Sequence, residues 1–459
     1  MKEELAGKES GQSILEVVIA LVIGVMTISA IIFVALGNQS IVLDSRINEE
    51  ALQLARESLE SVRAASQTDF SSVSSSTTTS GIYTKEIAVT SIDDYTKKVL
   101  SRVSWNTDPL RPQKIELTQL ITDPVAATSG GGDPGCNGIA GDWQHPATLG
   151  SVDLGPGNSA TGLDVINKIV YMTSVASSQS KPDFFIVDAT DGANPMLKSS
   201  LETGPGLNAV DVAGNYAYLA NNKTTSQLKI VDVSNVTSPV VTASLTLPSI
   251  GAEAISITYN GSKVYVGTKK GIGPEFHIID VTNPLVPVEL GSLEIGEDVN
   301  AIKVVAGKAY LATSLDSAEL KILDVSNPLL ISQLGSYDAP AGRNAYSLYV
   351  SGARLYLGRE GGSQDFSVLD ISNPVSIQLL GSKTLNQNIN AIVNNSYLSF
   401  LGTEDPNQAF QVLNSSSISN ITLWSSLKFP QVLASLDCEN NIVYAAMRSN
   451  DALRIITAP

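Results

Sequence analysis

The sequence predicts a mainly β protein in which a seven-bladed β-propeller follows a long N-terminal α-helix and a small antiparallel sheet. Three observations predict it: an apolar run near the N-terminus, a Gly/Pro-rich stretch after which the composition changes, and a repeat of 44–48 residues beyond it. The expected parts are a leader, 1–11, a helix-and-sheet module, 12–122, a linker, 123–144, and the propeller, 145–459.

The apolar run covers residues 14–37 and contains one charged residue, Glu16. As a helix, its 24 residues span about 36 Å, enough to cross a hydrocarbon core of roughly 30 Å. A carboxylate in a membrane helix is costly, so it usually has a function and a partner. An ordinary signal anchor with a stray acid is the alternative.

The residues around this acid, Gly11-Gln12-Ser13-Ile14-Leu15-Glu16, resemble the class III signal of type IV prepilins and pseudopilins. The resemblance implies that a prepilin peptidase cuts between Gly11 and Gln12 and methylates the new N-terminus. It also implies that Glu16 neutralises the N-terminal amine of a neighbouring subunit during filament assembly. Two departures concern cleavage efficiency: Gln12 stands where Phe is commonest, and Lys8-Glu9-Ser10 stands where a basic residue often abuts the glycine.

The helix is expected to continue to about residue 66, because Leu52, Ala55, Leu59 and Val62 form one apolar stripe. A flexible Ser/Thr-rich loop is predicted next, and then a sheet over 82–122. Its expected strands are 83–92, 97–106 and 114–122. A long helix followed by a short antiparallel sheet is similar to small pseudopilins, so 12–122 is interpreted as one pilin-like module.

The repeat is marked by an acid before a Ser-Asn-Pro type of turn. The acid recurs at Asp188, Asp232, Asp280, Asp324 and Asp370, with Asn414 in the sixth copy, at spacings of 44, 48, 44, 46 and 44 residues. Four strands in 40–50 residues are typical of a propeller blade. Blades are predicted to start near 160, 207, 253, 299, 345, 389 and 433. The last has three strands before Pro459. Strand 147–154 is expected to complete it, because its Leu-Gly-Ser resembles the Leu-Gly-Ser of other fourth strands, within 290–295, 334–339 and 380–385.

The run Leu228-Lys229-Ile230-Val231-Asp232 resembles the LVIVD family of secreted or cell-surface propellers. The resemblance covers nearly all of 145–459 and implies no settled biochemical role. Tyrosines recur in the second strand of most units, and we interpret them as architecture: Tyr171, Tyr218, Tyr265, Tyr310, Tyr356 and Tyr444.

The two cysteines, Cys136 and Cys438, are expected near the seam of the closing blade. This placement predicts a disulfide that locks the ring in an oxidising compartment. The alternative is a buried Cys438 with Cys136 unpaired in the linker.

Composition and motifs argue against several functions. A net charge of −16 disfavours nucleic-acid binding. With two histidines and no nucleophile elbow, phosphate loop, zinc pattern or EF-hand, we expect no enzyme activity, no metal site and no cofactor. His277 is expected to be an ordinary strand residue. Acids in loops between second and third strands are weak candidates for Ca²⁺: Asp316, Glu319, Glu360 and Asp365.

The expected function is that of a surface protein, anchored by one membrane helix or incorporated in a pilus as a minor subunit, whose extracellular propeller serves adhesion or ligand binding. Expected partners are the prepilin peptidase, other pilin or pseudopilin subunits, the membrane, and an unidentified surface protein or glycan. Two alternatives remain. One is a membrane-tethered hydrolase or lyase that depends on carboxylates or a metal, and the other is a secretion-system pseudopilin with a scaffolding propeller.

Overall fold

The computed structural model describes residues 14–68, 73–91, 96–106, 112–122, 136 and 139–458, apart from 177, 179, 205 and 396. The chain divides into two compact units, Met1–Pro124 and Val125–Pro459. The predicted leader, with Gly11, and the predicted new N-terminus, Gln12, lie outside the described residues, as does the side chain of Glu16. Among the described residues, no helix combines the length and hydropathy that crossing a membrane requires.

The first unit contains one helix and one sheet. Helix α1 runs over Ile14–Thr68, against a predicted 12–66. Its C-terminal part packs on an antiparallel meander of four strands in sequential order. The strands are β1 (Ser76–Ser80), β2 (Tyr83–Ser91), β3 (Thr96–Trp105) and β4 (Gln113–Thr122).

Two details of this unit differ from the sequence prediction. Leu52 lies outside the core, and the buried stripe is Ala51, Ala55 and Leu59, because small alanines let the helix approach Val103 and Trp105 closely. The predicted loop contains strand β1, which pairs with β2 across a turn in which Gly81 has φ +60°. All five residues of β1 are exposed, so no apolar alternation marks it in the sequence.

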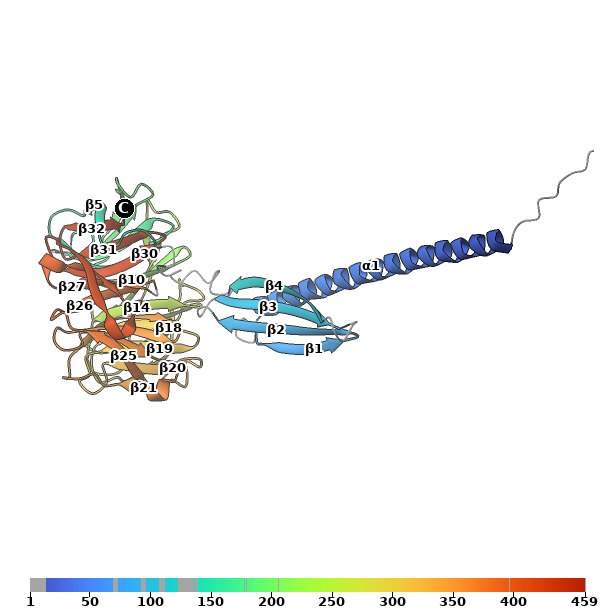
Figure 1. Ribbon diagram of the computed structural model, residues 1–459. Coiled ribbons are helices and arrows are strands. Elements are labelled where there is room, and N and C mark those ends of the chain that lie inside the picture. Colours follow the sequence, from blue (N-terminus) through green and yellow to red (C-terminus); the bar gives the residue numbers. More distant parts are fainter. Residues whose placement is uncertain are drawn as a thin grey trace, which may run out of the picture. The chain divides into compact units, whose positions relative to one another are not determined.

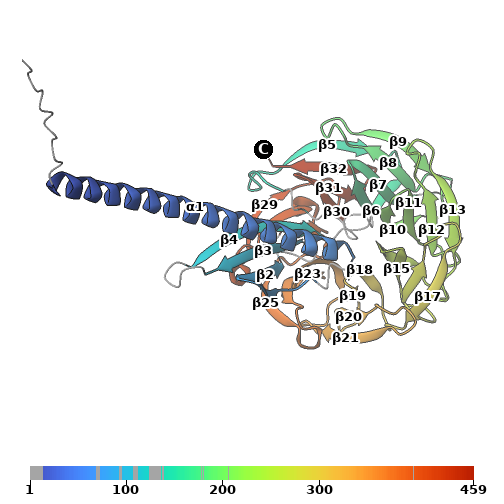
Figure 2. The same cartoon turned by 90° about the vertical axis from the view of Figure 1, so that its right-hand side faces the viewer.

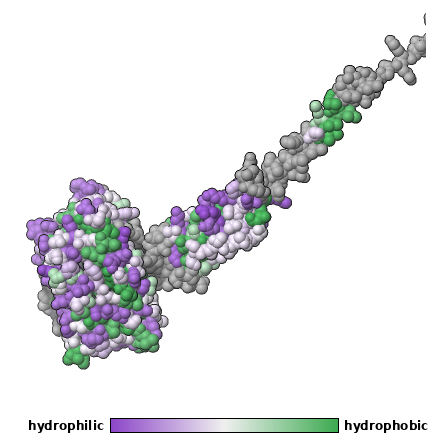
Figure 3. Space-filling model, turned by 60° about the horizontal axis from the view of Figure 1, so that its bottom comes forward, coloured by the Kyte–Doolittle hydropathy of each residue, from purple (hydrophilic) through white to green (hydrophobic). Residues whose placement is uncertain are grey.

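Helix α1 carries an apolar surface near its N-terminal end, the green group on the helix in Figure 3. Six apolar side chains there are 44–66% exposed: Leu21, Val22, Ile23, Val25, Met26 and Ile28. Because consecutive residues are about 100° apart, these six positions spread over about 220° of the helix circumference.

The second unit is a β-propeller of seven four-stranded sheets, the predicted number of blades (Figure 1). Neighbouring inner strands contact one another all round the ring, and β30 contacts β6 to close it (Figure 2). The observed inner strands begin at 158, 207, 254, 299, 345, 389 and 433, which confirms the predicted blade starts.

The strands of each blade follow one another from the channel outward. In blades 1–3 they are β6 (Asn158–Ile166), β7 (Ile169–Ala176), β8 (Phe184–Asp188), β9 (Met196–Leu201); β10 (Leu207–Ala213), β11 (Tyr216–Asn221), β12 (Leu228–Asp232), β13 (Val240–Leu245); β14 (Ala254–Asn260), β15 (Lys263–Thr268), β16 (Phe276–Asp280), β17 (Val288–Leu293). In blades 4–6 they are β18 (Val299–Val305), β19 (Lys308–Thr313), β20 (Leu320–Asp324), β21 (Ser332–Tyr337); β22 (Ala345–Ser351), β23 (Arg354–Arg359), β24 (Phe366–Asp370), β25 (Gln378–Lys383); β26 (Ile389–Asn394), β27 (Leu398–Thr403), β28 (Phe410–Asn414), β29 (Thr422–Leu427). Short 3₁₀ turns occur at η2 (Pro374–Ser376), η3 (Pro406–Gln408) and η4 (Ile418–Asn420).

Blade 7 is built from both ends of the unit, as predicted. Its strands are β30 (Leu433–Glu439), β31 (Ile442–Met447), β32 (Asp451–Thr457) and β5 (Ala147–Asp153), and β5 pairs with β32. Cys136 and Cys438, the predicted pair, form a disulfide with a Cα–Cα distance of 5.4 Å. Glu439 accepts the backbone N–H groups of Asn167 and Lys168 across the seam at 2.8 Å each.

The part of the predicted linker that the structure describes, residues 136 and 139–144, belongs to the propeller instead. Trp143 is fully buried, and its ring lies 4.7 Å from that of Phe400 in blade 6. The Ala140 N–H donates to Asn441 Oδ1 at 2.7 Å. The prediction was wrong here because these contacts join residues 257 and 301 positions apart, which leave no local pattern.

The Leu-Gly-Ser motif of the fourth strands has a packing explanation. A Cβ on Gly291, Gly335 or Gly381 would collide with a backbone carbonyl in the next blade, that of Pro328, Pro374 or Ile418. Each of these outer strands therefore abuts the turn between the third and fourth strands of its neighbour, and only glycine fits there.

Candidate binding channel

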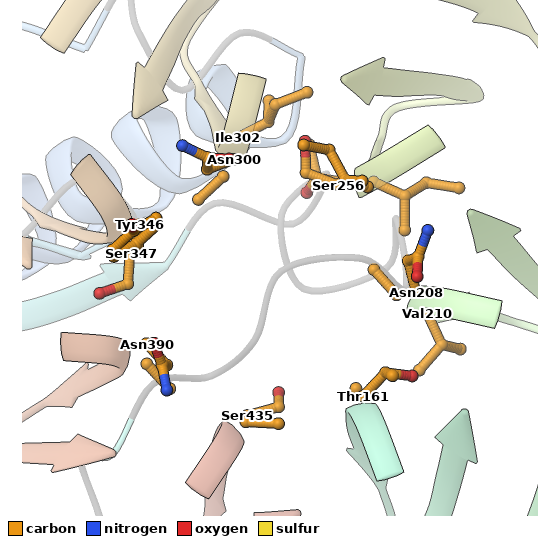
Figure 4. A pocket seen from close by; sticks show the side chains of 18 of the residues that line it. Thr161, Asn208, Val210, Ser256, Asn300, Ile302, Tyr346, Ser347, Asn390 and Ser435 are labelled. Carbon is orange, nitrogen blue, oxygen red and sulfur yellow. The ribbon is translucent and has the colours of Figure 1, made fainter. Parts of the chain in front are cut away.

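The inner strands of the seven blades surround a channel of about 530 Å³ (Figure 4). Each inner strand has a register shift, which is a β-bulge, at its second residue in blades 2–7 and at its fourth residue, Thr161, in blade 1. The bulged residues all line the channel wall: Thr161, Asn208, Ile255, Asn300, Tyr346, Asn390 and Ala434. The repeat thus places side chains of successive blades at one level of the channel.

A ring of small polar side chains at this level links neighbouring blades. Asn208 Nδ2 donates to Ala254 O at 2.7 Å, and Ser256 Oγ donates to Val299 O at 2.6 Å. Four more inter-blade bonds of this kind start from Thr161, Asn300, Ser347 and Asn390. These bonds satisfy backbone carbonyls on the inner edges of the sheets, where no further strand is available to pair with them.

A second group of bonds satisfies amides along the same edges. Asp437 accepts the Val165 N–H at 2.8 Å, across the seam from blade 7 to blade 1. Asp164 and Asp211 accept from Val212 and Tyr259 of the next blades. The three carboxylates therefore have a structural role on consecutive blades.

The acids proposed for Ca²⁺ do not come together as a metal site. Asp316 is exposed and Glu360 half-buried, whereas Glu319 and Asp365 are fully buried and accept backbone N–H groups of Ala339 and Leu385. Within the described part of the chain, no three potential metal-binding side chains lie together.

Glu319 and Asp365 occupy a repeated position just before the third strand, and each accepts an N–H twenty residues further on. Asp183, Gln227 and Glu275 do the same in blades 1–3. A buried alanine, Ala409, takes the position in blade 6, and Ala452, the second residue of β32, aligns with it in blade 7. These buried acceptors fasten the loop that leads to the next blade.

One of these acids belongs to a buried inter-blade ion pair. Arg359 Nη2 lies 3.5 Å from Glu319 Oε1, and both side chains are inaccessible to solvent. Burial raises the pKa of Glu319, and the Ala339 N–H and the charge of Arg359 partly oppose this rise. Burial lowers the pKa of Arg359.

His277 is fully buried in a network that has the connectivity of a catalytic triad. Its Nδ1 lies 2.7 Å from Glu289 Oε1, and its Nε2 lies 2.7 Å from Ser249 Oγ. Ser249 is itself buried, and its hydroxyl also bonds to Pro274 O. The network anchors the loop 246–252. Ser249 and His277 are buried and do not line the channel, so the network presents no accessible nucleophile.

The recurring tyrosines are buried between blades. Burial raises the pKa of Tyr171, Tyr265 and Tyr356, and all six lie in apolar clusters. They are therefore packing residues.

Comparisons with known proteins agree with this architecture. The model of the LVIVD repeat matches residues 208–246, 298–339 and 342–384, which are blades 2, 4 and 5. These blades are LVIVD repeats. No curated protein sequence matches the chain.

Solved propellers share the fold of the LVIVD-repeat unit. The WD40 β-propeller domain of Doa1 matches with a TM-score of 0.53 and 13% identity, over 69% of this chain and 98% of that one. The β-propeller domain of Cps50 (Swd1) from Myceliophteria thermophila matches with a TM-score of 0.52 and 12% identity, over 69% of this chain and 100% of that one. At these identities the likeness shows the fold alone.

Sequence reasoning located the blades and the seam but missed the channel residues. The available signal was the alignment of successive repeats, in which the bulged residue of each inner strand alternates between asparagine and other side chains.

Proposed function

We propose that the protein is a surface protein, anchored in the membrane or incorporated in a pilus as a minor subunit, whose propeller serves adhesion or binds a ligand outside the cell. The exposed apolar surface of α1 carries this proposal. A helix that exposes apolar side chains over more than half of its circumference needs an apolar environment, such as a membrane or the core of a filament. In water, the side chains from Leu21 to Ile28 would be an aggregation hazard.

The other half of the module supports the same role. From Ala51 to Leu59 the apolar side of the helix is buried against the sheet of the same unit, so this part of the helix needs no further partner. The pilin-like interpretation adds cleavage after Gly11 and a role for Glu16 as the counter-charge of the N-terminal amine of a neighbouring subunit. In the second unit, the ring is locked by a disulfide, which is typical of exported proteins.

The test is the fractionation of sheared surface filaments. Wild-type protein is expected in the filament fraction with its N-terminus at Gln12. Glu16→Ala is expected to be processed but missing from the filaments, because the amine of the neighbouring subunit loses its counter-charge. Glu49→Ala removes an exposed carboxylate from the same helix and should behave as wild type. Equal incorporation of Glu16→Ala, or wild-type protein that retains Met1, would contradict the proposal.

A further inference from the structure

Two polar side chains on the channel wall, Ser435 and Arg448, have no hydrogen bond or ion pair with any described residue. Other polar residues of the wall are engaged: for example, Asp298 accepts the Lys270 N–H, and Asp211 accepts the Tyr259 N–H. Both free side chains belong to blade 7, so the channel has unused donors on one side.

Comparison with blade 3 explains why Arg448 is free. Lys269 follows the second strand of blade 3, and its Nζ pairs with Glu253 Oε2 at 2.7 Å. Arg448 follows the second strand of blade 7, and its N–H donates to Val432 O as that of Lys269 donates to Glu253 O. Val432 of blade 7 thus stands where blade 3 has Glu253, and the exposed guanidinium of Arg448 has no counter-charge at this position.

Ser435 is free for a related reason. Ser256 and Ser347 occupy its position in blades 3 and 5, and each donates to a carbonyl of the next inner strand. Ser435 makes no such bond at the seam between blades 7 and 1, and Figure 4 shows its hydroxyl directed into the channel.

Acceptors lie on other sides of the channel. Asn208, Asn300 and Asn390 use their Nδ2 groups in the ring of inter-blade bonds, and no bond from a described residue reaches their Oδ1 atoms. The channel therefore offers a guanidinium and a hydroxyl to an anion, and amide oxygens to hydroxyl donors. Its volume of about 530 Å³ suits a small ligand.

We propose that the channel binds an acidic sugar, with the carboxylate of a uronic acid on Arg448 and Ser435 and its hydroxyls on the asparagine amides. Guanidinium and carboxylate form strong charge-assisted pairs with matched planar geometry. This inference rests on the binding role proposed above and names the class of its ligand.

Binding of glucuronate to the purified full-length chain, followed by saturation-transfer NMR titration, tests the proposal. Glucose and N-acetylglycine are the comparison ligands, because one lacks the carboxylate and the other lacks the ring hydroxyls. Glucuronate is expected to bind at least about tenfold more tightly than either. Arg448→Gln should abolish the preference for glucuronate over glucose, and Ser435→Ala should reduce it.

Arg354→Gln is the matched control, since Arg354 is an exposed arginine at the start of the second strand of blade 5 and does not line the channel. It changes the net charge equally and should keep the preference. Equal binding of glucuronate and glucose, binding of N-acetylglycine as tight as that of glucuronate, or an unchanged preference in Arg448→Gln would overturn the proposal. Because purified protein in solution is used, this outcome is separate from filament incorporation.

Discussion

The hydroxyl of Ser425 donates to the carbonyl of Trp143, 282 residues earlier in the chain, at 2.8 Å. In blade 1, Ser199 makes the equivalent bond to Val236 O, in the turn between the third and fourth strands of blade 2. The third and fourth strands of blade 7, β32 and β5, come from opposite ends of the unit. The segment around Trp143 therefore takes the place of that turn.

Replacement of Trp143 tests this role. Trp143→Ala is expected to lower the free energy of unfolding of the propeller by about 3–5 kcal/mol, because it removes a fully buried ring packed on Phe400. Equilibrium unfolding in urea measures the loss. Gln144→Ala, at an exposed neighbouring position, is the control and should change stability by less than about 0.5 kcal/mol. A Trp143→Ala protein as stable as the control would mean that the segment is a linker after all.

The glycine of the Leu-Gly-Ser motif should be intolerant of any side chain. Gly335→Ala places a methyl group against the backbone carbonyl of Pro374, so blades 4 and 5 must separate locally. The expected cost is more than about 3 kcal/mol, at the upper end of overpacking effects. Gly352→Ala meets no atom within 4 Å but has φ +57°, so its cost should be about 1 kcal/mol. Thermal unfolding of the two variants compares them, and a smaller loss in Gly335→Ala would contradict the packing argument.

The buried ion pair predicts a strong asymmetry between single and double variants. Arg359→Met leaves the carboxylate of Glu319 buried without its counter-charge, at an expected cost of about 3–5 kcal/mol. Adding Glu319→Gln should recover most of this loss, since the amide can still accept the Ala339 N–H. Urea unfolding of the two single variants and the double variant gives the coupling energy. Simple additivity of the single effects would show that the pair does not interact.

The aspartate of the repeated turn predicts how the stability of the propeller changes at low pH. The hydroxyl and N–H of Thr190, with Lys198, lower the pKa of Asp188 to about 2. A carboxylate with a lowered pKa stabilises the fold above its unfolded pKa of about 4, and this contribution is lost as the pH falls towards 2. Asp188→Asn should therefore cost less than about 1 kcal/mol at pH 7, with the difference shrinking towards pH 2. Asn414, which accepts from Ser416 in the same way, indicates that the turn itself tolerates the amide. A difference that does not change with pH would contradict the assignment.

The sequence predicted the ring because each blade repeats its own local pattern, from the inner strand to the acid at Asp232 or Asp280. It predicted the closing strand because Leu149-Gly150-Ser151 repeats the motif of the other outer strands. It did not predict the role of Trp143, whose partners lie at the other end of the chain, or strand β1, whose side chains are all exposed. The missing counter-charge of Arg448 could have been predicted from the sequence, because Val432 aligns with Glu253 across the repeats.

Peptide mapping by mass spectrometry, without reduction, of protein taken from the cell surface tests the account most directly. It should find an N-terminal peptide that begins with methylated Gln12, together with one cross-linked species that contains Cys136 and Cys438. The first identifies the processed anchor, and the second identifies a propeller that closed in an oxidising compartment. An N-terminal peptide that begins at Met1, with both cysteines present as free thiols, would contradict the account.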